Sequence, residues 1–172
     1  MQLKDKVALV TGAANGTGKV ISQKFLEEGA IVIAADVTEL QWDAGVYDNK
    51  IFKYVFDVSN EYAVNKAINE INEKTQGISI LVNNAGIALE ANLQDIELEM
   101  WEKVFAINTR GTFLCTKAVV ENMLLKNISG SIINISSIAG RNAFPGSSAY
   151  SASKAAVIGF TRALAAELGP HD

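Results

Sequence analysis

Short apolar runs alternate with amphipathic stretches along the whole chain. The apolar runs, rich in β-branched residues as buried parallel strands are, cover residues 6–10, 30–35, 51–56, 78–82 and 131–135. Apolar residues recur at helical spacing between and after these runs, over residues 18–28, 60–74, 95–108, 111–126 and 148–168. This alternation predicts an α/β fold, with a doubly wound parallel sheet that carries helices on both faces.

Two segments break the alternation. Residues 38–50 are polar and poorly periodic, and they predict a loop with at most one turn of helix. Residues 139–147 predict a second loop, and Gly169 and Pro170 are expected to end the last helix. The chain contains no low-complexity segment or linker, so residues 1–172 are expected to form a single domain.

A glycine-rich turn at residues 11–18 joins the first strand to the first helix. Glycines let a backbone turn tightly and approach a phosphate, whose charge a helix N-terminus favours. The spacing of Gly12, Gly16 and Gly18 differs from G-x-G-x-x-G, and Val20 stands where a Walker A loop needs Ser or Thr. The turn therefore indicates a dinucleotide site, with an ordinary glycine turn as the alternative.

Asp36 follows the second strand, about twenty residues after the glycine turn. An acid there is placed to accept hydrogen bonds from an adenosine ribose. The same carboxylate would repel a 2′-phosphate, and no Arg or Lys occupies Ala14, Asn15 or Val37 to counter that repulsion. These positions favour NAD over NADP, although acids that cap turns are also common after strands.

A Tyr-x-x-x-Lys segment at Tyr150 and Lys154 lies in the last predicted helix, and Ser137 precedes the tyrosine by thirteen residues. A lysine four residues later lies on the same helix face, where its positive charge favours the phenolate of the tyrosine. A serine hydroxyl nearby can hold a substrate oxygen by a hydrogen bond. The segment predicts an acid/base group, and an amphipathic helix that merely carries both residues is the alternative.

Together these motifs resemble the short-chain dehydrogenase/reductase family, in a Rossmann-like version of the predicted fold, over essentially the whole chain. The family's N-N-A-G stands at residues 83–86, and its catalytic asparagine matches Asn108. The spacing to Tyr150 matches Ser137 rather than Ser136 to the catalytic serine. The pair of Asp57 and Val58 resembles the segment that flanks the adenine ring.

The resemblance implies two sets of site residues. The implied catalytic set is Asn108, Ser137, Tyr150 and Lys154. The implied cofactor-binding set, for NAD, is Gly12, Asn15, Gly16, Thr17, Gly18, Asp36, Asp57, Val58, Asn84, Ala85, Gly86, Tyr150 and Lys154.

The resemblance also implies reversible hydride transfer between NAD and a secondary alcohol or its ketone. Tyr150 would act as the general acid/base and Ser137 would hold the substrate oxygen. Lys154 would favour the phenolate and bind the nicotinamide ribose, and Asn108 would hold a water that relays protons through Lys154. The alternative is a nucleotide-binding or interaction module without turnover.

Family members usually continue with further strands after the helix that carries the tyrosine. The chain stops where a sixth strand is expected, so we expect a fragment of a longer enzyme, with a genuine short form as the alternative. In a genuine short form the strand at residues 131–135 would lie at an edge of the sheet.

Composition narrows the remaining classes. With 49% hydrophobic and 20% charged residues among 172, the chain is typical of a globular domain, and a net charge of −4 gives no basic surface for nucleic acid. No apolar stretch is long enough for a bilayer and the first residues do not resemble a signal peptide, so a cytoplasmic protein without membrane contact is expected. Cys115 has no disulfide partner. The only histidine, His171, stands next to the last residue, which argues against a Ser-His-Asp triad and against a His/Cys zinc site. No metal is expected.

The helices at residues 111–126 and 148–168 carry more apolar residues than one sheet face needs. The family associates through the matching helices. We therefore expect a homodimer or homotetramer, with packing inside one subunit as the alternative, and a small-molecule alcohol or ketone as the substrate.

Overall fold

A five-stranded parallel sheet forms the centre of the protein. The structure is a computed structural model that describes residues 1–142 and 144–171. The sheet has the order β3-β2-β1-β4-β5. Its strands are β1 (Val7–Thr11), β2 (Ile31–Asp36), β3 (Ile51–Val55), β4 (Ile80–Asn83) and β5 (Ser131–Asn134). This confirms the predicted strands to within a few residues, with β5 at one edge of the described sheet.

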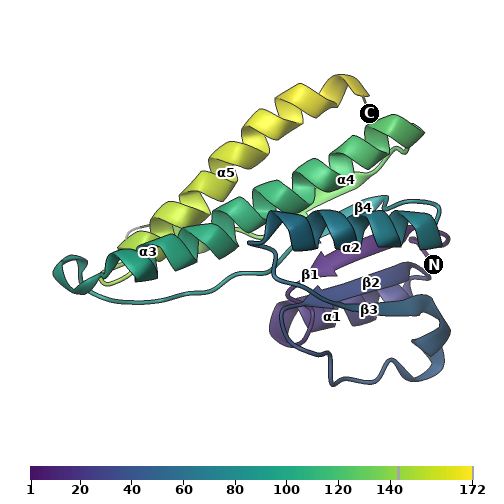
Figure 1. Cartoon of the computed structure of the whole chain (residues 1–172), viewed down its shortest axis with the longest axis horizontal. Helices are drawn as coiled ribbons and strands as arrows, with labels where there is room; N and C mark the ends of the chain where they lie inside the picture. The colour runs from purple at the N-terminus through teal and green to yellow at the C-terminus, as the bar shows by residue number, and fades with distance from the viewer. Residues whose placement is uncertain (143, 172) are drawn as a thin grey trace.

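Helices cover both faces of the sheet, which confirms the doubly wound, Rossmann-like α/β class (Figure 1). The helix α1 lies on one face, and α2 and α4 lie on the other, with the long helix α5 running beside α4. The helices are α1 (Gly16–Glu27), α2 (Glu61–Lys74), α3 (Leu98–Phe105), α4 (Thr112–Lys126) and α5 (Ser148–Leu168). Residues 38–44 are irregular as predicted, but the 3-10 helix at Gly45–Lys50 makes about two turns, where at most one turn of helix was predicted.

The pleat of β1 divides the core into two halves. Val7 and Leu9 pack toward α2 and α4, while Ala8 and Val10 pack toward α1. All five residues of β1 are buried, as expected for a central strand with helices on both faces. The sheet therefore holds its strand ends rigidly, and the site is built at those ends.

One predicted helix boundary was wrong. The predicted helices at residues 95–108 and 111–126 are joined by a π-helix at Ala106–Gly111, so α3, the π-helix and α4 form one continuous helical run. Gly111 does not end a helix but allows a close approach, because a Cβ there would lie 2.7 Å from Cγ2 of Val58. Single π-turns inside helices are frequent at functional sites.

Cys115 lies on α4 and belongs to the core cluster that the sheet, α2 and α4 share. It is completely buried, and this burial raises the pKa of its thiol to about 12. The thiol is therefore protonated at neutral pH and acts as a small apolar side chain.

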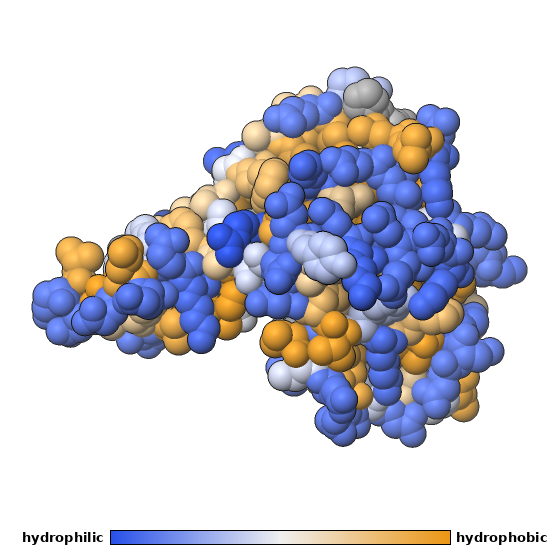
Figure 2. Space-filling view, viewed as in Figure 1, coloured by the Kyte–Doolittle hydropathy of each residue, from blue (hydrophilic) through white to orange (hydrophobic). Residues whose placement is uncertain are grey.

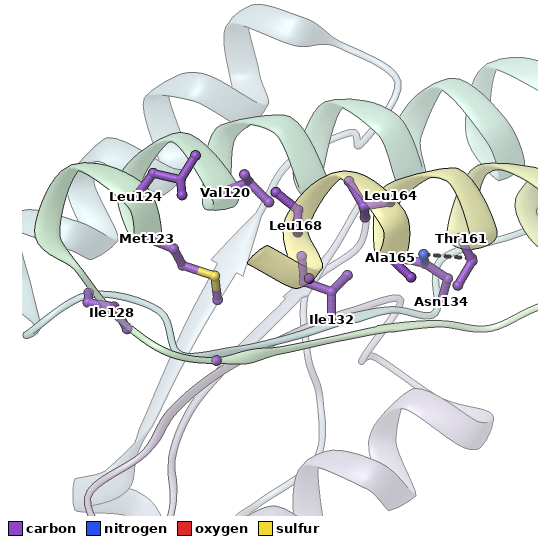
Figure 3. A pocket seen from close by; sticks show the side chains of 12 residues that line it. Val120, Met123, Leu124, Ile128, Ile132, Asn134, Thr161, Leu164, Ala165 and Leu168 are labelled. Atoms are coloured by element: carbon purple, nitrogen blue, oxygen red, sulfur yellow. Dashed lines mark hydrogen bonds between the residues drawn. The ribbon is translucent and has the colours of Figure 1, made fainter. Parts of the chain in front are cut away.

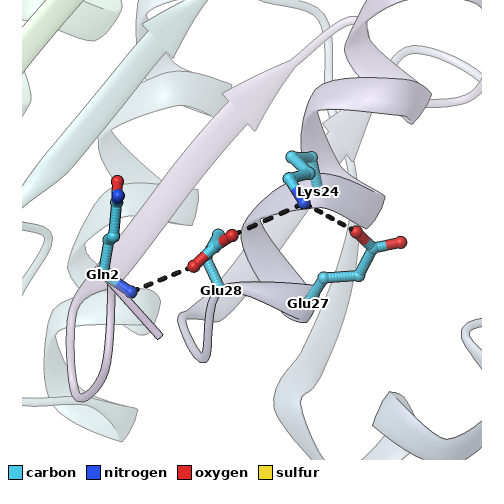
Figure 4. A network of polar contacts seen from close by, with 4 residues as sticks. All are labelled: Gln2, Lys24, Glu27 and Glu28. Atoms are coloured by element: carbon cyan, nitrogen blue, oxygen red, sulfur yellow. Dashed lines mark hydrogen bonds and ion pairs between the residues drawn. The ribbon is translucent and has the colours of Figure 1, made fainter.

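Charged side chains fasten the N-terminal segment to the end of α1 (Figure 4). Lys24 forms ion pairs with Glu27 at 3.0 Å and with Glu28 at 3.4 Å, and Glu28 accepts a hydrogen bond from the backbone N–H of Gln2. The hydrogen bond from Gln2, helped by Lys24, lowers the pKa of the Glu28 carboxyl. All of these groups are exposed to solvent, so they contribute little to stability.

An apolar groove of about 320 Å³ lies between α4, β5 and α5. Met123 from α4, Ile132 from β5 and Leu168 from α5 point into it (Figure 3). Within the described residues no helix is long and apolar enough to cross a membrane.

Candidate functional site

A cleft of about 630 Å³ opens at the carboxyl ends of β1, β2 and β4. The strand order reverses between β1 and β4, and this is where doubly wound sheets bind their ligands. Figure 2 shows the surface hollowed between the arm that carries α3 and the lobe that carries β1–β3. The cleft is lined by Gly12, Asn15, Thr17, Asp36, Val37, Phe56, Asp57, Val58, Asn84, Ala85, Gly86, Ile87, Lys103 and Ile107.

The glycine turn fits so closely against its neighbours that side chains are excluded. Gly12 has a φ of +65°, and a Cβ there would lie 2.8 Å from Cα of Ala85. A Cβ at Gly18 would collide with the carbonyl oxygen of Gly12 and lie 2.5 Å from Nδ2 of Asn84. Gly16 has a φ of +50° with open space around it, so it is needed for its backbone conformation alone.

Asn84 ties the glycine turn to the end of β4. Its Nδ2 donates to the carbonyl of Thr11 at 2.9 Å and to that of Gly12 at 3.0 Å. In return, the Thr11 hydroxyl accepts from the backbone N–H groups of Asn84 and Ala85, each at 3.1 Å. The side-chain amide of Asn84 therefore spends its donors on the turn, and this residue shapes the cleft from within.

Asp36 holds the rim of the cleft at the end of β2. Its Oδ2 accepts from the backbone N–H of Ala14 at 2.9 Å, and its Oδ1 accepts from the N–H and hydroxyl of Thr38 at 3.2 and 3.3 Å. A carboxylate has about four acceptor positions, so Asp36 keeps capacity for a ribose hydroxyl. The expected turn is present at this acid, and its carboxylate also lines the cleft, while the contact with a ribose stays a prediction.

Asp57 and Val58 come shortly after β3 and also line the cleft. Asp57 accepts from the N–H and hydroxyl of Ser59, each at 2.8 Å, which makes a tight turn before α2. Val58 is buried against the π-helix at Gly111. The turn fixes an apolar surface beside a carboxylate, an arrangement that suits a flat ring with an exocyclic amine.

Asn108 lies in the π-helix and is almost completely buried. Its Oδ1 accepts from the N–H of Ile87 at 2.8 Å, and its Nδ2 donates to the Ile87 carbonyl at 2.9 Å and to the Ser153 hydroxyl at 3.0 Å. Both amide hydrogens are used, so a water on this side chain would have to donate to Oδ1. Asn108 mainly clamps the segment after β4.

Lys154 extends from α5 to the position of Gly86, which lines the cleft, without lining the cleft itself. Its Nζ donates to the carbonyl of Ile135 at 2.7 Å and lies 5.9 Å from the centre of the Tyr150 ring. The side chain is 5% exposed, and burial lowers the pKa of its ammonium group. A Cβ at Gly86 would lie 3.2 Å from Oδ1 of Asn108 and 3.3 Å from this Nζ. Because Gly86 has no side chain, the predicted catalytic residues Asn108 and Lys154 lie directly beside the cleft.

The two neighbouring serines differ in what they bind. Ser136 donates to the carbonyl of Lys154 at 2.8 Å, which anchors the loop to α5. Ser137 accepts from the N–H of Ala139 at 3.1 Å and begins the 3-10 helix at Ile138–Gly140. The Ser137 hydroxyl keeps its own hydrogen for another acceptor, which favours it over Ser136 as the catalytic serine.

The structure brings most of the predicted cofactor residues into one cleft. Gly16, Gly18, Tyr150 and Lys154 do not line the cleft. Gly16 and Gly18 shape the turn, and Nζ of Lys154 lies beside the Gly86 position. The sequence motifs did not point to four further residues in the cleft wall, which are Phe56, Ile87, Lys103 and Ile107. Lys103 and Ile107 are four residues apart on one helical run, and this spacing was available as a signal.

Comparison with known sequences identifies the family. The family model described as short chain dehydrogenase matches residues 6–172, and the chain belongs to this family. A 3-oxoacyl-(acyl-carrier-protein) reductase of Thermotoga maritima is 40% identical over 173 residues, covering 98% of this chain and 70% of that protein.

Two further relatives have names that state other substrates. A 2-(R)-hydroxypropyl-CoM dehydrogenase of Xanthobacter autotrophicus is 40% identical, over 94% of this chain and 68% of that protein. An NAD-dependent glycerol dehydrogenase of Listeria innocua is 35% identical, over 99% of this chain and 67% of that protein. The class of the protein is therefore an oxidoreductase of a family that uses nicotinamide cofactors.

The glycine turn gives a direct test of this geometry. Gly18→Ala should lower the free energy of unfolding by roughly 2 kcal/mol or more, because the new methyl meets the backbone of Gly12 and overpacking costs about 1–3 kcal/mol. Gly159→Ala is the matched control, since a Cβ there meets open space on α5, and alanine should raise stability by about 0.5–1 kcal/mol. Urea unfolding measures both, and equal stabilities would contradict the close approach.

Proposed function

We propose that the protein transfers a hydride between NAD(H) and a secondary alcohol or its ketone. The observation that carries this proposal is the position of Gly86, whose missing side chain leaves Asn108 and Lys154 next to the floor of the glycine-turn cleft. The pair of Tyr150 and Lys154 can therefore work on a ligand that the cleft holds.

The residues of the cleft suit a dinucleotide. The turn at Gly12 and Gly18 has no room for side chains, which leaves backbone and the N-terminus of α1 to meet a pyrophosphate. Asp36 would accept from the adenosine ribose, and Val58 and Ile107 would pack against the adenine. Lys154 would bind the second ribose from the cleft floor. When bound, the cofactor supplies the hydride chemistry.

Tyr150 would act as the general acid/base. In oxidation its phenolate takes the hydroxyl proton of the alcohol, and in reduction the phenol returns it to the ketone oxygen. Ser137 would hold that oxygen with its free hydroxyl hydrogen. The ammonium of Lys154, 5.9 Å from the Tyr150 ring, favours the phenolate. Asn108 would keep one acceptor, Oδ1, for a water on the path of the proton to solvent.

Cofactor choice rests on charge. Asp36 places a carboxylate at the cleft rim, where it would repel a 2′-phosphate. Lys103, the one cation among the described residues that line the cleft, comes from α3 rather than from the loop after β2. One relative carries NAD dependence in its name, which agrees with NAD as the preferred cofactor.

The relatives' names suggest the substrate class. One acts on a 3-oxoacyl group, one on a hydroxypropyl group and one on glycerol, and each of these carries an alcohol or a ketone. We infer a secondary alcohol or ketone for this protein as well.

Tyr150→Phe tests the acid/base role. The variant should bind NAD within about threefold of the parent and lose roughly 10²–10⁴-fold in turnover, because positioned proton transfer typically contributes that much. Tyr62→Phe is the control, since Tyr62 is 76% exposed on α2. Calorimetric NAD binding and a steady-state assay on a panel of secondary alcohols measure both. Near-parental turnover in Tyr150→Phe would contradict the mechanism. If the parent protein binds NAD but turns over none of the alcohols, the result would favour a nucleotide-binding module.

Asp36→Ala combined with Val37→Arg tests cofactor choice. The double variant should bind NADP at least ~10-fold more tightly, because a hydrogen bond to a charged group contributes about 1.5–3 kcal/mol and the repelling carboxylate is gone. Asp43→Ala is the control for charge, as Asp43 is exposed and outside the cleft. If the parent protein already binds NADP more tightly than NAD, the interpretation that Asp36 selects NAD is wrong.

We also infer a homodimer or homotetramer. Phe113 on α4 stacks edge to face with Phe160 on α5 yet is 45% exposed, and Leu125 on α4 is 80% exposed. Such apolar surface on adjacent long helices is expected to be covered in an assembly. Sedimentation at low micromolar concentration should show dimers or tetramers, and a clean monomer would contradict this inference.

A further inference from the structure

The hydroxyl of Ser153 joins two parts of the site that are 45 residues apart in sequence. Ser153 lies between Tyr150 and Lys154 on α5 and is completely buried. Its Oγ accepts from Nδ2 of Asn108 at 3.0 Å and donates to the carbonyl of Tyr150 at 2.7 Å. The Thr109 hydroxyl donates to the Ser153 carbonyl at 3.3 Å, so the π-helix contacts this residue twice.

A serine that bonds back to an earlier carbonyl of its own helix is common and has no function by itself. Ser153 differs because its single hydroxyl hydrogen is spent on Tyr150, so Asn108 must approach as a donor. The amide of Asn108 can be oriented in only one way, since the N–H of Ile87 has to meet Oδ1. The direction of every bond in the chain from Ile87 to Tyr150 is thereby fixed.

A second contact farther along α5 follows the same pattern. The amide of Asn134 on β5 donates to the Thr161 hydroxyl at 2.9 Å, and that hydroxyl donates to the Val157 carbonyl at 2.7 Å. Thus α5 is held at two points by an amide from outside the helix that donates to a hydroxyl. The contact at Ser153 is the one within the turn that carries Tyr150 and Lys154.

The first contact also connects to the cofactor cleft. Asn108 clamps Ile87, which lines the cleft, and Oδ1 of the same amide lies beside the Gly86 position together with Nζ of Lys154. A shift of α5 relative to this clamp would move the phenol and the ammonium together away from a ligand in the cleft. Misplacement by about 1 Å can cost ~10²-fold in rate.

We propose that Ser153 is a positioning residue, whose buried hydroxyl sets the first turns of α5 against the Asn108 clamp and so places Tyr150 and Lys154 over the cleft. This inference rests on the proposed function for its effect on turnover. Its effect on the position of Lys154 does not need turnover.

Ser153→Ala tests the proposal, with Ser151→Ala as the matched control. Ser151 is on the same helical turn, and its buried hydroxyl has no hydrogen-bond partner among the described residues. Ser153→Ala should lower kcat roughly 10- to 100-fold, because the acid/base pair is displaced, and should weaken NAD binding by less than about tenfold, because the proposed contact of Lys154 with the nicotinamide ribose is displaced with it. Ser151→Ala should leave both unchanged.

A double-mutant cycle identifies the route. If Ser153 acts through Asn108, Ser153→Ala should add little to the loss of kcat caused by Asn108→Ala. Additive losses, a change in NAD affinity instead of kcat, or equal losses in the Ser151→Ala control would overturn the proposal.

Amine labelling of Lys154, followed by mass spectrometry, gives a readout without turnover. The labelling rate should rise several-fold in Ser153→Ala, because a displaced α5 opens the 5%-exposed amine to water, while labelling of the more accessible Lys126 stays constant. If the parent binds NAD but does not turn over, the proposed function fails and this experiment alone decides the position of Lys154. An unchanged Lys154 rate, or a rise at both lysines from general loosening, would overturn the role of Ser153.

Discussion

The cleft depends on the two hydrogen bonds that the side-chain amide of Asn84 donates. This amide bonds the carbonyls of Thr11 and Gly12 and so locks the end of β1 to the end of β4, where the strand order reverses. Both carbonyl oxygens carry partial negative charge. Because each accepts a hydrogen bond from the Asn84 amide, this charge would repel less strongly the pyrophosphate that the cleft is proposed to hold. The close fit at Gly12 and Gly18 follows from the same contact, because the turn must lie against Asn84.

Buried asparagines recur wherever an element must be placed rather than only packed. Asn83 donates to Thr116 at 2.9 Å and to Asn134 at 2.8 Å, which joins α4 and β5 to the centre of the sheet. Asn108 does the same for α5 and the segment after β4. Apolar contacts supply most of the stability but tolerate sliding, whereas an amide loses about 1–3 kcal/mol if a buried partner is missed. The apolar core thus stabilises the layers, and the amides set their relative positions.

The sequence predicted the strands, the glycine turn and α5 well, because each leaves a local signal of apolar period or glycine spacing. It did not predict the π-helix at Ala106–Gly111, because the local apolar pattern carries no signal for it, and the close contact of Gly111 is with Val58, about fifty residues earlier in the chain. The partners of Asn108 and Ser153 were equally hidden, as they are 21 and 45 residues apart in sequence. Resemblance placed the site residues in the chain, but only the packed structure shows which of them shape the cleft and which of them face it.

Lys154 shows how the site relates stability to binding. Burial lowers the pKa of its ammonium, so the folded protein bears a desolvation cost whenever this group is charged, and the cost fades only as the pH rises through the lowered pKa toward the unfolded value. In the described structure Nζ of Lys154 donates a hydrogen bond to the Ile135 carbonyl at 2.7 Å. A ligand that brought further oxygens to the cleft floor would offset the desolvation in the bound state alone. If the proposed cofactor binds to Lys154, the desolvation cost to the free protein would become affinity for that cofactor, and the proposed role of the Ser153 contact is to hold Lys154 in place for it.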